Sequence, residues 1–210
     1  MPNLIEINPK IKHSPILETI VSICIPGTII ILSILFLKLT IVSPIYVDYF
    51  LSIVIALSAI SYLYFKKIPL ASIGIRRKGS NQSLLYSIIL IIIFLIYGIF
   101  SYHLKLNLEN TALKVFLKGL YYIFVIALGE EIWVRGIVFN FLEKLKGGNF
   151  ALIISSLIFS AFHMRHGMDA IFFALIFGLC FGFVRLKTKN ILGLILSHGI
   201  FILAVTDLLI

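Results

Sequence analysis

Three ionisable residues, Glu130, Glu131 and Arg135, interrupt an apolar stretch at residues 119–142. Glu131 and Arg135 are four residues apart, so a helix places them on one face, in the acid-first order that favours an ion pair. Glu130 lies about 140° around the helix axis from Arg135 and is left without that partner. A carboxylate in a low-dielectric environment resists ionisation and accepts a proton readily, which suits a general base that activates water. A purely stabilising Glu–Arg pair is the alternative interpretation.

Two histidines lie in later apolar stretches. His163 ends the run Phe159-Ser-Ala-Phe-His163, and His198 follows Ser197 in the last stretch. A rise of about 1.5 Å per residue puts both histidines and Glu130 roughly 10–20 Å from the cytoplasmic ends of their helices, so the three are expected to share one cavity. One carboxylate and two imidazoles suit either of two arrangements. One is a zinc or other divalent metal site made of Glu130, His163 and His198, and the other is direct activation of water by a Glu–His pair.

The composition requires that these groups sit inside a membrane. Of the 210 residues, 60% are hydrophobic and only 13% are charged, about half the charged share of a soluble domain. A soluble fold of this length has too few polar residues to cover its surface. The net charge of +9 comes from basic residues in short breaks between apolar runs. We therefore interpret them as topology signals and lipid-headgroup contacts, and expect no nucleic-acid partner.

The elements that must position the site are transmembrane helices. Seven apolar segments are long enough to cross the bilayer once their flanking residues are included, at residues 19–37, 49–65, 79–102, 119–142, 147–162, 170–184 and 190–206. The sequence predicts an all-α, polytopic membrane helical bundle of about seven helices, with a range of six to eight. Residues 1–118 are expected to supply N-terminal helices without motifs, and residues 119–210 the motif-bearing helices of the same bundle.

Two further patterns concern orientation and packing. The loops on the N-terminal side of the predicted bundle carry most of the Lys and Arg residues, which puts the N-terminus in the cytoplasm. Gly178 and Gly182 form a GxxxG pattern, expected to let two helices of the bundle pack closely. Asp48 is interpreted as a helix-edge residue. His166, three residues after His163, either approaches the same site or, as we favour, lies in a loop. Tyr121, Tyr122 and Trp133 are expected to pack or to line a substrate cleft.

The three motifs together resemble those of a known family. Glu130-Glu131-x-x-x-Arg135, then Phe159-x-x-x-His163, then His198 in a C-terminal span are similar to the signatures of the CPBP family. These are the CAAX-protease and bacteriocin-processing intramembrane endopeptidases, described as metalloproteases and related to the type II CAAX prenyl endopeptidase. The resemblance covers roughly residues 129–207, including a basic turn near residues 185–190.

The resemblance also implies residue roles. Glu130 would activate the hydrolytic water with His163 beside it, and Glu131, Arg135 and Phe159 would support the motifs. His198 matches the first position of the third motif, in which a His and an Asn four residues later polarise the scissile carbonyl. Here that later position is Ile202.

The predicted function is therefore an intramembrane endopeptidase that hydrolyses a peptide or membrane-protein substrate with Glu/His-activated water. The expected partners are that substrate and membrane lipids, and the expected location is a bacterial plasma membrane. Losing one oxyanion donor costs about 10²–10³ in rate, so Ile202 favours an alternative. In it the protein is a non-catalytic or weakly catalytic bacteriocin self-immunity protein that binds a toxin or its receptor. A small transporter is disfavoured, because carriers show paired repeats with broken helices in both halves.

Overall fold

The fold is all-α, as predicted. The computed structural model describes residues 20, 21, 24, 25, 28, 44–102, 105–107 and 110–209. Within this part of the chain there is no strand, and only an isolated antiparallel bridge joins Leu106 to Leu209. The predicted segment at residues 19–37 falls almost entirely outside the described residues. The other six predicted segments all coincide with helices, which confirms the predicted class of fold.

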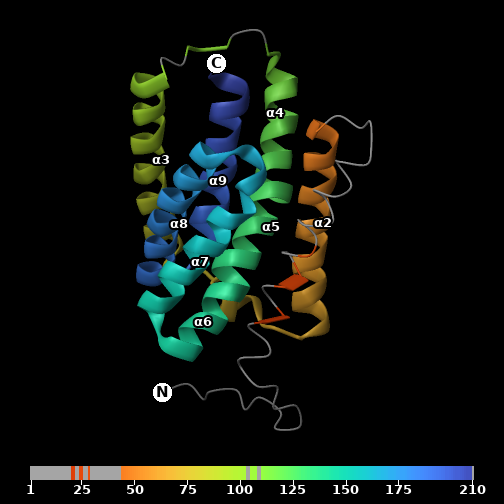
Figure 1. Ribbon diagram of the computed structural model, residues 1–210, viewed down its shortest axis with the longest axis vertical. Coiled ribbons are helices and arrows are strands. Elements are labelled where there is room, and N and C mark those ends of the chain that lie inside the picture. The colour runs from red at the N-terminus through yellow and green to blue at the C-terminus, as the bar shows by residue number, and fades with distance from the viewer. Residues whose placement is uncertain are drawn as a thin grey trace.

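The helices stand side by side in one bundle, in which α9 lies between α3 and the long helix that begins with α4 (Figure 1). In chain order they are α2 (Pro44–Phe65), α3 (Ser80–Tyr102), α4 (Ala112–Tyr121), α5 (Leu128–Glu131), α6 (Phe139–Lys146), α7 (Gly148–Phe162), α8 (Met168–Thr188) and α9 (Leu192–Leu203). Three π-helical segments are interposed, Tyr122–Ala127, Ile132–Val138 and Ala204–Leu208.

Four of the described helices are long and apolar enough to cross a membrane, Tyr46–Phe65, Ser80–Phe100, Ala112–Lys146 and Met168–Thr188. The predicted segment at 119–142 is the central part of the 35-residue helix Ala112–Lys146, which is formed by α4, α5, α6 and two of the π-helical segments. Helices Gly148–Phe162 and Leu192–Leu208 are shorter. The protein is therefore an integral membrane protein.

The distribution of polar groups matches a lipid surrounding. Large apolar side chains such as Tyr64 and Phe100 are more than three-quarters exposed, as expected where the surface faces acyl chains. Serines instead lie between helices. The Ser87 hydroxyl lies 2.8 Å from the Ser197 hydroxyl and donates to the Gly193 carbonyl. Polar contacts thus hold α3 against α9, next to His198.

Glycines let the helices that carry the site approach closely. A Cβ atom at Gly199 would lie 2.6 Å from the Cα atom of Ile123, and one at Gly129 would lie 2.9 Å from the Cα atom of Ala56. Both distances are shorter than real Cβ contacts, so these positions require glycine. Gly129 precedes Glu130 and Gly199 follows His198. The contact of Gly199 therefore sets the spacing between α9 and the long helix, which carry His198 and Glu130, and the contact of Gly129 sets the spacing between the long helix and α2.

The predicted GxxxG packing is confirmed within the bundle. Gly178 packs on the backbone of Ser156 and Gly182 packs on Leu152, so the two small residues bring α8 against α7.

The π-helical geometry is a departure from the regular helix that the sequence predicts. Segments Tyr122–Ala127 and Ile132–Val138 flank the single α-helical turn that holds Glu130 and Glu131. A π-helix bonds residue i to i+5 and shifts the side chains of its neighbours around the axis. Such insertions concentrate at functional sites, and here two of them frame the acidic pair.

Candidate active site

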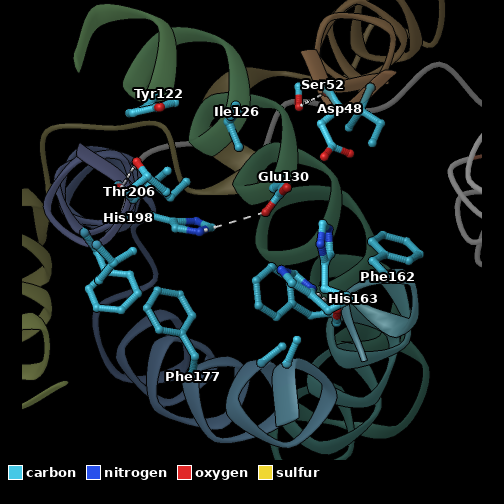
Figure 2. Close-up of a pocket in the computed structure, with 18 of the residues that line it drawn as sticks. Asp48, Ser52, Tyr122, Ile126, Glu130, Phe162, His163, Phe177, His198 and Thr206 are labelled. Atoms are coloured by element: carbon cyan, nitrogen blue, oxygen red, sulfur yellow. Dashed lines mark hydrogen bonds and ion pairs between the residues drawn. The ribbon is translucent and has the colours of Figure 1, made fainter. Parts of the chain in front are cut away.

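A cavity of about 620 Å³ opens between α2, the long helix, α7, α8 and α9 (Figure 2). Its volume is in the range of small-molecule and peptide sites. Glu130, His163 and His198 all line it. The structure thus brings together the three residues that the sequence places at a similar depth.

Glu131 is the buried member of the acidic pair. Its side chain is completely buried, and its Oε1 atom accepts hydrogen bonds from Arg135 Nη1 at 3.2 Å and from His198 Nδ1 at 2.9 Å. The predicted i, i+4 ion pair with Arg135 is confirmed. The contact with His198 was not predicted, because the two residues are 67 positions apart and only the packing of α9 on the long helix joins them.

Glu130 extends from the long helix into the cavity (Figure 2). Its side chain is 23% exposed, and its Oε2 atom lies 3.9 Å from His198 Nε2. This distance is too long for a direct hydrogen bond, and an oxygen atom in the cavity beside the two groups can contact both of them. His198 therefore lies between the two glutamates, with its Nδ1 atom on the buried carboxylate and its Nε2 atom toward the cavity carboxylate.

The hydrogen bonds of both histidines fix which ring nitrogen faces the cavity. His163 Nδ1 lies 2.9 Å from the carbonyl oxygen of Phe159, and His198 Nδ1 lies 2.9 Å from the Glu131 carboxylate. Carbonyl and carboxylate oxygens only accept, so each Nδ1 atom carries a hydrogen. The Nε2 atom of each ring is then left for chemistry in the cavity.

Phe159 connects the parts of the site. The guanidinium carbon of Arg135 lies 4.0 Å from the centroid of its ring, a cation–π contact. The ring centroids of His163 and His198 lie 4.7 Å and 6.0 Å away. Phe159 is almost completely buried, so its position is set by packing. The geometry is that of a support, while the catalytic roles of all these residues stay predictions.

Whether the donors fit a metal depends on their number and arrangement. A histidine whose Nδ1–H is donated to a carbonyl or a carboxylate is in the tautomer that metal ligands adopt. The described residues, however, bring together no three His, Cys, Asp or Glu side chains in an arrangement that could hold a metal ion. A zinc site at Glu130, His163 and His198 stays a prediction.

Several polar residues of the cavity were not predicted as site residues. They come from α2, from the beginning of the long helix, from the turn after α7 and from the π-helical segment after α9: Asp48, Ser52, Lys118, His166 and Thr206. The assignment of Asp48 to a helix edge missed that it lines the cavity. His166 lies in the turn after α7, as favoured, and from there it also lines the cavity. Of the three aromatic candidates, Tyr122 and Trp133 line it. Tyr121 instead donates to the carbonyl of Tyr49 in α2.

A buried carboxylate holds three residues of the cavity wall in place. Asp207 is 3% exposed and accepts hydrogen bonds from Lys118, from the Tyr122 hydroxyl at 2.7 Å and from Thr206 Oγ1 at 3.0 Å. No periodicity in the sequence links these residues, since they meet only where α9 ends against α4. Ile202, at the third-motif position that resemblance assigns to Asn, lines the same cavity with an apolar side chain.

Residues 111–204 match the family model described as type II CAAX prenyl endopeptidase Rce1-like. No curated protein and no solved structure matches the chain at a significant level. The matched range includes the long helix, α7, α8 and α9, and hence Glu130, His163 and His198. The cavity-bearing part of this membrane protein, residues 111–204, is thus an Rce1-like domain of the CAAX-protease family.

Proposed function

We propose that this protein is an intramembrane endopeptidase in which Glu130 activates water and His198 polarises the scissile carbonyl. The observation that carries the proposal is the arrangement of these two groups. Glu130 Oε2 and His198 Nε2 face each other across 3.9 Å at the wall of the cavity. The Nδ1 atom of His198, on the side of the ring away from Glu130, is hydrogen-bonded to the fully buried Glu131, which also forms an ion pair with Arg135.

The reaction follows from the two functional groups. The Glu130 carboxylate accepts a proton from water while the water oxygen bonds to the carbonyl carbon of the substrate. His198, in the form that carries a hydrogen on both ring nitrogens, donates its Nε2–H to the carbonyl oxygen on which negative charge develops. The proton held by Glu130 then passes to the leaving nitrogen as the C–N bond breaks, so one peptide and one water give a carboxylate and an amine. In the tetrahedral intermediate one oxygen faces Glu130 and the other faces His198.

Glu131 has a different task from its neighbour. It is buried, with Arg135 and His198 both bonded to one of its oxygens. A carboxylate bonded to Nδ1 orients the imidazole and stabilises its charged form, as in other hydrolases that pair an acid with a histidine. Because Glu131 offers no exposed oxygen to the cavity, we assign it to support and Glu130 to proton transfer.

The proposal is tested by cleavage of a prenylated peptide that ends in a CAAX sequence, with purified protein in liposomes. The Glu130→Gln variant keeps the size of the side chain and removes the base, so we expect cleavage to fall about 10²–10⁴-fold. Glu143→Gln is the matched control, because Glu143 lies on the same long helix, outside the cavity, in an ion pair with Lys189. Equal loss in both variants, or no loss in Glu130→Gln, would refute the proposal.

One observation favours a second candidate function. Ile202 offers no hydrogen-bond donor at a position where the resemblance implies an amide, and it lines the cavity. In this alternative the protein is a bacteriocin self-immunity protein of the bacterial plasma membrane, with its N-terminus in the cytoplasm, that binds a toxin or its receptor. Cells that express the Glu130→Ala, His163→Ala variant would then resist the toxin as well as cells that express the original protein. Loss of resistance at equal expression would favour proteolysis.

A further inference from the structure

Arg185 is a charged residue buried in the bundle near the end of α8. The sequence assigns it to a basic turn, yet it is only 2% exposed. Its Nε atom donates to the backbone carbonyl of Arg135 at 3.1 Å. Its guanidinium carbon lies 5.4 Å from the centroid of the Phe139 ring. Arg185 thus contacts the backbone and an aromatic side chain of the long helix from outside the cavity.

The π-helical segment Ile132–Val138 takes the usual α-helical donor away from the Arg135 carbonyl. In a regular α-helix that carbonyl would accept from the amide of Phe139. Here the Phe139 amide donates to the carbonyl of Val134 instead, five residues back. A carbonyl left without a partner in a membrane interior costs free energy. Arg185 donates a side-chain hydrogen bond to that carbonyl across the helix interface.

The same residue, Arg135, carries the next contact toward the site. Its side chain pairs with Glu131, whose Oε1 atom also accepts from His198 Nδ1. The chain of contacts therefore runs from Arg185 through the backbone and side chain of Arg135 to Glu131 and His198. Every one of these four side chains is at least nine-tenths buried, so bulk water does not compete for their hydrogen bonds.

We propose that Arg185 is a positioning residue: by bonding the carbonyl released in the π-helical segment, it fixes Arg135 and, through Glu131, the imidazole of His198 against Glu130. The activity part of this inference rests on the proposed function. The geometric part, the dependence of the His198–Glu131 hydrogen bond on Arg185, does not. Small displacements of positioning groups affect turnover strongly, up to about 10²-fold per ångström.

Two substitutions separate the hydrogen bond from the charge. In Arg185→Gln the amide nitrogen stands at the same bond position as the arginine Nε atom, so the donor is kept while the charge is lost. Arg185→Met has a similar reach and no donor. We expect kcat for peptide cleavage to fall about tenfold in Arg185→Met with little change in KM, and to stay within about threefold in Arg185→Gln. Equal loss in the two variants, or a change confined to KM, would overturn the proposal.

A control variant and a replacement variant complete the set. Lys187→Gln removes an exposed charge from the same end of α8 and is expected to leave kcat and KM unchanged. Should Arg185→Met fail to fold, Arg185→Lys takes its place, since it keeps the charge and moves the donor one bond outward. The proposal then requires a higher kcat in Arg185→Gln than in Arg185→Lys. The reverse order would show that the charge matters and would overturn it.

A spectroscopic measurement distinguishes failure of this inference from failure of the proposed function. Histidine labelled with nitrogen isotopes reports the Nδ1–H of His198, and its signal is identified by its loss in a His198→Gln variant. We expect that signal to shift or broaden in Arg185→Met and to persist in Arg185→Gln, whether or not any peptide is cleaved. An unchanged signal in Arg185→Met would overturn the positioning role even if the protein is a protease.

Discussion

The same substitution at the adjacent residues Glu130 and Glu131 should change the free energy of unfolding by very different amounts. Glu131→Gln removes a charge that is fully buried and bonded to both Arg135 and His198. Breaking a buried ion pair from one side leaves the other charge uncompensated and costs about 3–5 kcal/mol. Glu130→Gln changes a side chain that is 23% exposed and 3.9 Å from its charged neighbour. That change should alter the free energy of unfolding by less than about 1 kcal/mol.

The assay uses a probe already present in the chain. Trp133 is the single tryptophan and is completely buried two residues beyond Glu131. Its fluorescence, followed while an unfolding detergent is titrated into mixed micelles, gives the free energy of unfolding for the original protein and both variants. Cleavage of a peptide is measured on the same samples. Glu130→Gln should be stable and inactive, whereas Glu131→Gln should be unstable.

One result would refute the reasoning. If the two substitutions lower the free energy of unfolding by the same amount, Glu131 is not the buried support of His198 and Glu130 is not the base that faces the cavity. The assignment of support to Glu131 and of proton transfer to Glu130 would then be wrong, whatever the effect on activity.

Three further predictions concern spacing and hydrogen bonding around the cavity. Gly199→Ala places a Cβ atom 2.6 Å from Ile123 Cα and should cost about 1–3 kcal/mol. Gly119→Ala, which meets only a flexible leucine terminus at 3.3 Å, should cost less, and equal unfolding midpoints would argue against helix spacing as the cause. Ile202→Asn adds a donor to the cavity wall and should raise kcat at least about tenfold; an unchanged kcat in steady-state cleavage would contradict this. Asp207→Asn weakens the hydrogen bonds from Lys118, Tyr122 and Thr206 and should destabilise the protein by about 3 kcal/mol. An unchanged thermal unfolding midpoint in that variant would show that Asp207 does not hold these three residues.

Much of the fold could be predicted from the sequence because lipid imposes a simple rule. Every spanning segment must be helical and apolar, so each predicted segment on described residues coincides with a helix. The ends of the helices were less predictable. The segment predicted at 119–142 extends to Ala112–Lys146, since Lys114 and Lys118 and the residues after Leu142 stay helical in spite of their charge.

The site was predictable where it depends on local periodicity. The Glu131–Arg135 pair follows from i, i+4 spacing and is confirmed. The common cavity of Glu130, His163 and His198 follows from their depth along the helices.

Other contacts of the site depend on tertiary packing. The bond between Glu131 and His198 requires the close approach that Gly199 permits on Ile123. The bond from Arg185 to the Arg135 carbonyl requires a π-helical segment. Neither has a signal in the spacing of the sequence, because both depend on where α8 and α9 pack against the long helix.

The central claim is that Glu130 takes a proton from the water that attacks the scissile carbonyl. Its most direct measurement is cleavage of a peptide in water that carries a heavy oxygen isotope. The purified original protein and the Glu130→Gln variant are compared under conditions in which both are equally folded. The account predicts that the new carboxylate of the product carries the heavy oxygen, and that its rate of formation falls at least about 10²-fold in Glu130→Gln. An undiminished rate of labelled product in Glu130→Gln would contradict it.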